Sequence, residues 1–243
     1  MDTVKTLDQL GQLRLQGMAN RYKDILDLPL QQQPEAHQMI AWLAEAESLY
    51  RNHQRTQLYL RLSKLRYHAT LEQVHCSSSR GITQEQLLLL GDGMFIQKAE
   101  NVILTGATGC GKSYLACALG RRACMLGYRT LYFSMNRFIE ALAAARIDGS
   151  YIKWLNNIAK TPLLILDDFG LQPLSHDMKL TLLQILEDRY ATGATIITSQ
   201  LPFPNWYEHL DDPSLADAIM DRMSASAHKI QLTGQSLRNK KLS

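Results

Sequence analysis

An eight-residue stretch, Gly106 to Ser113, carries glycine, lysine and serine in the order Gly-x-x-x-x-Gly-Lys-Ser. Its glycines let the backbone curve around an anion, and N–H groups at the start of a following helix add partial positive charge. We expect Lys112 to reach the β- and γ-phosphates of a nucleotide and the Ser113 hydroxyl to ligate Mg²⁺. A glycine-rich turn matching by chance is the alternative, but an apolar strand precedes this motif and a helical stretch follows it. The predicted contacts are Gly106, Ala107, Thr108, Gly109, Cys110, Gly111, Lys112, Ser113 and Tyr114.

Two adjacent carboxylates follow a second apolar segment in the sequence PLLILDDFG. Leu163 to Leu166 predict a buried parallel strand, and ligands bind at the carboxyl ends of such strands. Asp167 is therefore suited to the outer coordination of Mg²⁺. Asp168 is suited to orienting or deprotonating an attacking water. The alternative is an ordinary solvated strand end.

A third apolar segment, ATIITSQ, ends in Thr198, Ser199 and Gln200. A polar side chain at that place can contact the γ-phosphate and the attacking water. We therefore name Gln200, and after it Ser199, as catalytic candidates. In the alternative interpretation these residues only cap the strand.

Five short apolar segments alternate with helical patterns after Asn101, which predicts an α/β fold with a parallel five-stranded sheet. The strands are expected in NVILTG, RTLYFS, PLLILDDFG, ATIITSQ and HKIQLTG. Residues 1–75 show helical periodicity and predict a small all-helical domain, in which the stretch after Pro34 is expected to form two helices. Residues 76–98 are interpreted as a linker and lead-in helix, and residues 99–243 as the catalytic domain.

Composition is that of a globular protein, with 46% hydrophobic and 20% charged residues and a net charge of +3. The four cysteines form no Cys-x-x-Cys pair, so neither zinc nor a disulfide framework is predicted. No segment approaches the roughly 20 apolar residues that span a bilayer. We expect a cytoplasmic protein with reduced thiols.

The order of these motifs resembles that of AAA+ ATPases, and within them the branch that contains the DnaC helicase loader and the IstB transposition helper. The phosphate loop is followed by an extra strand, the acidic strand, the polar strand and then DAIMDRM. IstB is the nearer match, through LLLLGDGMFIQKAENVILTGATGCGKSYLACALG, through LEDRYATGATIITSQLPFPNWYEHLDDPSLADAIMDRM and through the closing LTGQSLR. The opening LDQLGQLRLQGMANRY is also similar to that family, so the resemblance covers nearly the whole chain.

The resemblance implies a bacterial ATPase that uses ATP and Mg²⁺, assembles into homo-oligomers on DNA and acts with a partner transposase. It also implies active sites between subunits, with Arg222 as the arginine finger and Arg189 as the next arginine to consider. Many relatives carry glutamate where Asp168 stands, so the carboxylate here is one methylene shorter. A helical lid of ordinary size is not expected after the last strand, and Arg238 is a candidate substitute for the lid arginine. In the alternative interpretation Arg222 is a surface arginine that ends a helix.

Two basic stretches are candidates for DNA contact, because cations that neutralise phosphates release counterions. If residues 48–71 form one continuous helix, three arginines fall within an arc of about 60°. The second stretch lies between residues 137 and 160, where related initiator-type ATPases place DNA-contacting helices. For the first stretch the alternative is a solvated basic face, or one that packs against an acidic neighbouring subunit. The candidates are Arg51, Arg55 and Arg66, and Arg137, Arg146 and Lys153.

The function that we expect is that of an ATP-dependent transposition helper that binds duplex DNA without reading sequence and recruits or activates a transposase. One alternative is a helicase loader of the DnaC type, for which weaker duplex binding is expected. Another is a metabolic P-loop kinase, against which the arginine in MDRM and the lack of an evident acceptor pocket both argue.

Overall fold

The computed structural model describes residues 3–237, in two compact units. The first unit is Met1–Leu58 and the second is Tyr59–Ser243. The division falls inside one helix, well before the boundary at residue 75 that the sequence suggests. Residues 59–75 therefore group with the sheet-containing unit.

The first unit is helical. It contains α1 (Thr3–Gln12), α2 (Gln16–Leu26), a 3₁₀ turn at Leu30–Gln32 and most of α3 (Ala36–Ser63). The prediction of two helices after Pro34 is wrong, because α3 is continuous over 28 residues. Its sequence has no glycine or proline that would interrupt it.

A buried carboxylate fixes α2 to α3 within this unit. Glu47 on α3 accepts hydrogen bonds from the backbone N–H groups of Gly17 (2.8 Å) and Met18 (3.2 Å), which are orphan donors in the first turn of α2. The same carboxylate pairs with Nε of Arg51 at 2.7 Å. A Cβ on Gly17 would lie 2.5 Å from the carbonyl oxygen of Ala46, so this approach requires glycine.

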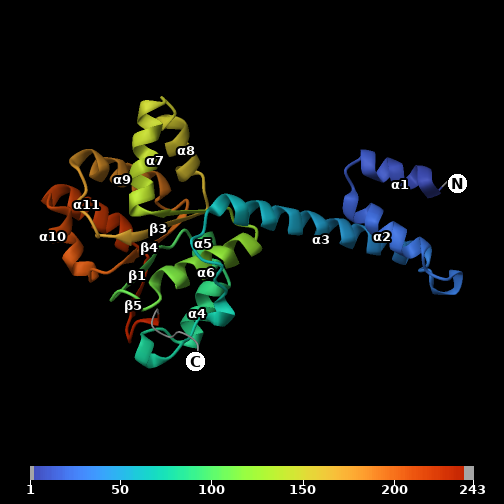
Figure 1. Cartoon of the computed structure of the whole chain (residues 1–243), viewed down its shortest axis with the longest axis horizontal. Helices are drawn as coiled ribbons and strands as arrows, with labels where there is room; N and C mark the ends of the chain where they lie inside the picture. Colours follow the sequence, from blue (N-terminus) through green and yellow to red (C-terminus); the bar gives the residue numbers. More distant parts are fainter. Residues whose placement is uncertain (1–2, 238–243) are drawn as a thin grey trace. The chain divides into compact units, whose positions relative to one another are not determined.

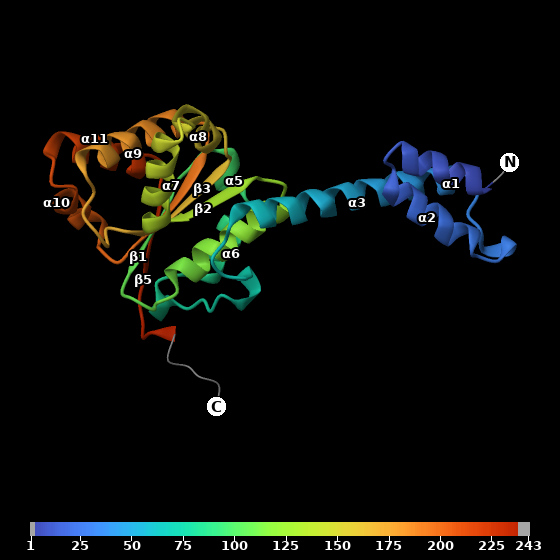
Figure 2. The ribbon, with the colours of Figure 1, turned by 45° about the horizontal axis from the view of Figure 1, so that its top comes forward.

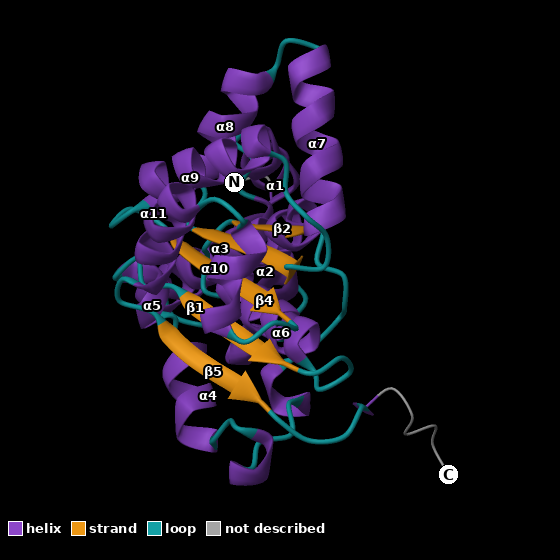
Figure 3. Ribbon diagram, turned by 90° about the vertical axis from the view of Figure 1, so that its left-hand side faces the viewer, coloured by secondary structure: helices purple, strands orange, loops and turns teal. Residues whose placement is uncertain are grey.

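The second unit contains the predicted parallel five-stranded sheet (Figure 3). Its spatial order is β2-β3-β4-β1-β5, and every neighbouring pair is parallel. The strands are β1 (Val102–Gly106), β2 (Thr130–Ser134), β3 (Leu163–Phe169), β4 (Ala194–Ser199) and β5 (His228–Leu232). All five predicted strands are confirmed, and their carboxyl ends meet at one edge of the sheet.

Helices cover both faces of the sheet (Figures 1 and 2). On one face lies α6 (Lys112–Met125), together with α4 (Gln84–Gly91) and α5 (Met94–Gln97). On the other lie α7 (Met135–Ile147), α8 (Tyr151–Ala159), α9 (His176–Arg189), α10 (Trp206–Leu210) and α11 (Pro213–Ser224). Alternate residues of β3 enter the two cores, with Ile165 in the first and Leu164 and Leu166 in the second. The part of this unit that the structure describes also contains 3₁₀ turns at Leu71–Gln73, Ser78–Arg80 and Phe203–Asn205.

The fully buried guanidinium of Arg189 joins the ends of several of these elements. It donates to the backbone carbonyls of Ile158 (2.8 Å), Thr161 (2.6 Å) and Ala194, and to the Thr195 hydroxyl (3.1 Å). Burial lowers the pKa of Arg189 to about 10, so the group stays charged at neutral pH. It therefore satisfies carbonyls where α8 ends and where β3 and β4 begin.

We expect Arg189→Met to destabilise the second unit by at least about 3 kcal/mol. Each buried carbonyl that loses its donor costs roughly 1–3 kcal/mol. Urea unfolding of the full chain measures this loss, with the exposed Arg61→Met as the matched control. An Arg189→Met midpoint equal to that of the parent would show that these hydrogen bonds do not support the fold.

Candidate active site

The phosphate-loop motif forms the turn between β1 and α6, as predicted. Gly106, Gly109 and Gly111 have φ values of 143°, 84° and 99°, which side chains rarely adopt. A Cβ on Gly106 would lie 2.1 Å from the Leu232 carbonyl oxygen, and one on Gly109 would lie 2.2 Å from the Ser236 hydroxyl. Glycine is thus required by the backbone conformation at all three positions. At Gly106 and Gly109 it is also required because the end of β5 and the chain after it lie too close for a side chain.

Lys112, the first residue of α6, is buried with its ammonium group inside the curve of the loop. Its Nζ donates to the carbonyl oxygens of Gly106 (2.8 Å) and Ala107 (2.9 Å). Arg80 donates to the carbonyl of Cys110 at 2.7 Å and so supports the loop from a distant part of the chain. The sequence does not reveal that Arg80 supports the loop, because Arg80 lies 30 residues before its acceptor in a segment without a motif.

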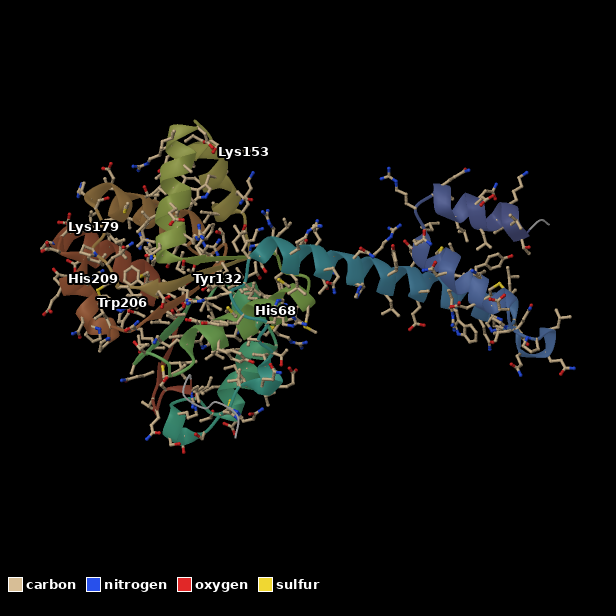
Figure 4. All side chains as sticks on the ribbon, viewed as in Figure 1. His68, Tyr132, Lys153, Lys179, Trp206 and His209 are labelled. Carbon is tan, nitrogen blue, oxygen red and sulfur yellow. The ribbon has the colours of Figure 1, made fainter. Side chains whose placement is uncertain are left out.

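Asp167 is fully buried beside the loop and accepts hydrogen bonds from three hydroxyl groups. The donors are Ser113 (2.8 Å), Tyr132 (2.6 Å) and Thr198. Burial and the nearby Asp167 raise the pKa of Tyr132, which keeps its phenol protonated as a donor. Tyr132, which Figure 4 labels, was missed because nothing in β2 marks it as functional.

The Ser113 hydroxyl and the Asp167 carboxylate fit a magnesium ion. Both are hard oxygen ligands, and Mg²⁺ at nucleotide sites takes one or two such protein ligands, with phosphates and waters as the others. The described residues contain no cluster of three or more histidine, cysteine or acidic side chains that would form a separate metal site.

Asp168 follows in a left-handed backbone conformation, with φ at 65°. The register of β3 against β4 is irregular between Leu166 and Phe169, and the Asp168 N–H donates to the Thr198 hydroxyl at 3.0 Å. Burial, and then the neighbouring Asp167, raise the pKa of Asp168, while Arg66 and Lys112 act in the opposite direction. The main chain of Asp168 is thus held in place, and this residue lines the cavity described next.

A cavity of about 340 Å³ adjoins the loop, within the size range of small-ligand pockets. Seven of the nine predicted loop residues line it, and Gly106 and Ala107 do not. Its other walls include a segment that the sequence suggested was linker or helical domain, through Tyr67, Gln73, Val74, His75, Arg80 and Ile82. The Tyr114 hydroxyl also donates to the Gln73 side chain at 2.7 Å. This wall has no sequence motif, so only the fold reveals it.

The two polar candidates at the end of β4 differ in placement. Gln200 reaches the loop, where its Oε1 accepts a hydrogen bond from the Thr108 hydroxyl at 2.6 Å. Ser199 is fully buried; its hydroxyl donates to the Phe169 carbonyl (2.7 Å) and accepts from the Leu201 N–H (3.1 Å). The hydroxyl is thus engaged with backbone, and the structure does not support a catalytic role for Ser199.

Arg222 lies at the opposite end of the strands from its own phosphate loop. Its carbonyl accepts from the side chain of Asn101, which precedes β1, at 3.1 Å. Its guanidinium pairs with Asp221 at 2.8 Å and lies 5.2 Å from the centroid of the Tyr190 ring. The length of the sheet therefore separates Arg222 from the phosphate loop of its own chain. The alternative, Arg189, is excluded by burial, and Arg238 lies outside the described residues.

The predicted basic arc on a helix through residue 66 is wrong, because α3 ends at Ser63. Arg66 follows the helix and pairs with Asp168, so we do not propose it as a DNA contact. The other five candidates are on helices: Arg51 and Arg55 on α3, Arg137 and Arg146 on α7, and Lys153 on α8. Figure 4 labels Lys153. Four of them have polar partners, which are Glu47 for Arg51, Asn52 for Arg55, Glu140 for Arg137, and Asp177 and Thr181 for Arg146.

We expect Lys112→Ala to weaken ATP binding about tenfold to a hundredfold, because a hydrogen-bonded cation contributes roughly 1.5–3 kcal/mol. Equilibrium titration with a fluorescent ATP analogue measures the affinity. Lys153→Ala, which removes an exposed lysine on α8, is the control. Equal affinity in the Lys112→Ala variant and the parent would contradict the assignment of the phosphate loop.

Comparison with solved structures supports the fold. The chain is similar to DnaI (TM-score 0.59, 22% identity, 73% of this chain and 94% of that chain). It is also similar to the DnaC helicase loader (TM-score 0.55, 21% identity, 69% and 98%). Both lie within the AAA+ fold, and at these identities the likeness concerns the fold alone. No helix in residues 3–237 combines the length and hydrophobicity needed to cross a membrane.

Sequence comparison identifies the family. A protein of Sinorhizobium fredii named "Putative insertion sequence ATP-binding protein y4pL" is 40% identical over 233 residues, which cover 96% of this chain and 95% of that protein. The "Insertion sequence IS21 putative ATP-binding protein" of Pseudomonas aeruginosa is 28% identical over 95% of this chain and 87% of its own length. The model of the IstB-like ATP binding protein family matches residues 8–243, and the chain belongs to that family.

Proposed function

We propose that this protein is a Mg²⁺-dependent ATPase that assists the transposition of an insertion sequence. The observation that carries the hydrolytic part is the placement of Asp167 and Asp168 beside Lys112 and Ser113. The names of the relatives, which are insertion sequence ATP-binding proteins, support the biological part.

The loop, Lys112 and the first turn of α6 bind the triphosphate through N–H groups and one cation. Ser113 and Asp167 hold the metal, which when bound offsets phosphate charge. Asp168 orients a water toward the γ-phosphorus and accepts its proton as the water oxygen bonds to phosphorus. The bond from the γ-phosphorus to the bridging oxygen breaks, and its electrons leave with ADP. Gln200, placed at the loop by Thr108, is the polar group next to this reaction.

Arg222 completes the site of a neighbouring subunit. Its place at the amino ends of the strands, with the phosphate loop at the carboxyl ends, supports contact in trans. An arginine finger stabilises charge on the γ-phosphoryl group in the transition state and contributes on the order of a thousandfold or more. Hydrolysis is thereby coupled to homo-oligomer formation.

The assembled protein binds duplex DNA and recruits or activates a transposase. Arg137, Arg146 and Lys153 on α7 and α8 are the DNA contacts that we favour, and Lys153 is exposed without a partner among the described residues. Helicase loading of the DnaC type is the alternative. It predicts weaker binding to duplex than to single-stranded DNA.

We expect Asp168→Asn and Arg222→Ala each to bind ATP nearly as well as the parent and to lose hydrolysis, by at least about a hundredfold for the arginine. A mixture of the two should recover part of the activity, because an intact Asp168 site can then face an intact Arg222. Phosphate release across mixing ratios measures this recovery. Arg121→Ala is the matched arginine control. A mixture as inactive as its components would show that Arg222 does not act between subunits.

We expect the triple variant Arg137→Glu, Arg146→Glu and Lys153→Glu to bind duplex DNA weakly and to reduce the salt dependence by about three in log–log slope, at roughly 0.9 per phosphate contact. The double variant Arg51→Glu and Arg55→Glu tests α3 in the same titration. Fluorescence anisotropy with ATP at several salt concentrations measures both. If neither variant differs from the parent, these surfaces are not the DNA-binding track.

A further inference from the structure

Arg66 contacts the two carboxylates at the end of β3, although it is 102 residues distant from Asp168 in the chain. Its Nη1 lies 3.3 Å from Oδ2 of Asp168 and 3.8 Å from Oδ2 of Asp167. Arg66 belongs to neither the phosphate loop nor the strands that carry the nucleotide motifs. A cation this close to a candidate catalytic carboxylate can affect the chemistry, the fold or both.

The chain around Arg66 is anchored on both sides. Lys64 takes a left-handed conformation, with φ at 56°, directly after α3 ends. Leu65 packs against the core on the α6 face of the sheet, and Ala69 is fully buried in that core. The Arg66 guanidinium also lies 5.4 Å from the ring centroid of Tyr67, which lines the nucleotide cavity. The position of the guanidinium is therefore set by the folded unit.

Arg66 contacts Asp168 from a cavity other than the one beside the phosphate loop. Asp168 lines the nucleotide cavity and also a second cavity of about 410 Å³, whereas Arg66 lines only the second. Arg66 engages Oδ2, and no hydrogen-bond donor among the described residues engages Oδ1. One carboxylate oxygen is thus held by the arginine, and the other accepts no hydrogen bond from a described residue.

We propose that Arg66 is a positioning residue for ATP hydrolysis, which holds one oxygen of the Asp168 carboxylate and so orients the other toward the attacking water. This inference rests on the hydrolytic role proposed for Asp168. The left-handed backbone and the Thr198 hydroxyl fix the main chain of Asp168. Arg66 fixes the side chain, which is the part that must receive the proton.

The contacts around Asp168 leave the orientation of its side chain to one ion pair. Tyr132 on β2 donates to Asp167, and Lys64 and Arg137 line the second cavity. Among the described residues, Arg66 alone donates a side-chain hydrogen bond to the Asp168 carboxylate. Removing Arg66 therefore leaves this carboxylate free to rotate about its side-chain bonds.

The test compares Arg66→Met, Arg66→Lys and the exposed control Arg61→Met in steady-state ATP hydrolysis. In Arg66→Met we expect kcat to fall at least about tenfold with KM for ATP little changed, because orientation rather than binding is lost. Arg66→Lys keeps a hydrogen-bonding cation at this position and should recover part of the lost kcat, and Arg61→Met should match the parent.

A kcat in Arg66→Met equal to that of the parent would overturn the proposal. So would a fall in kcat accompanied by an equal weakening of ATP binding, since that pattern belongs to a structural role. If Arg66→Met does not fold, kcat and KM of Arg66→Lys and Arg66→Gln decide between these outcomes. Failure of the underlying function is separate, because parent and Asp168→Asn would then hydrolyse ATP alike.

Discussion

A buried carboxylate with three hydroxyl donors holds the site together. Asp167 on β3 accepts from Tyr132 on β2, from Thr198 on β4 and from Ser113 on α6. An ionised group without water is costly unless it is hydrogen-bonded and its charge is offset. The hydroxyls satisfy its oxygens but carry no charge, and Arg66 lies 3.8 Å away. A divalent cation next to Ser113 would supply the missing positive charge, which explains why a carboxylate is kept in the interior at this place.

The sequence predicted the parts of the site that are local in the chain. The phosphate loop is one continuous segment whose glycines are required by backbone conformation, and the two aspartates stand where an apolar strand ends. The five strands were found because their apolar segments are short and are bounded by turn residues. Helical periodicity is less informative in the first 75 residues. It predicts two helices where α3 is one, and it extends the helical pattern beyond Ser63, where α3 ends.

The parts that could not be predicted come from distant segments without motifs. Arg66 looked like one member of a basic helical face, because its spacing from Arg51 and Arg55 is helical and its acidic partner lies about a hundred residues away. Tyr132 resembles any aromatic residue in a strand. Ser199 is a different case, since its position at a strand end suggests chemistry, whereas in the structure its hydroxyl is hydrogen-bonded to the backbone.

The residues proposed to act in ATP hydrolysis lie at opposite ends of the sheet. The phosphate loop, Asp167, Asp168 and Gln200 gather at the carboxyl ends of the strands, and Arg222 lies near Asn101 at the amino ends. A single chain therefore cannot bring its own Arg222 to its own γ-phosphate without losing the fold.

In the proposed reaction, the carboxyl end of β3 in one subunit and Arg222 of another act on the same γ-phosphate. Electron cryomicroscopy of the protein with Mg²⁺ and a non-hydrolysable ATP analogue tests this arrangement. We predict metal density at Ser113 and Asp167, Asp168 beside the γ-phosphate, and Arg222 of the adjacent subunit within hydrogen-bonding distance of that phosphate. Nucleotide density away from Lys112, or an Arg222 that contacts no γ-phosphate in any assembled copy, would contradict it.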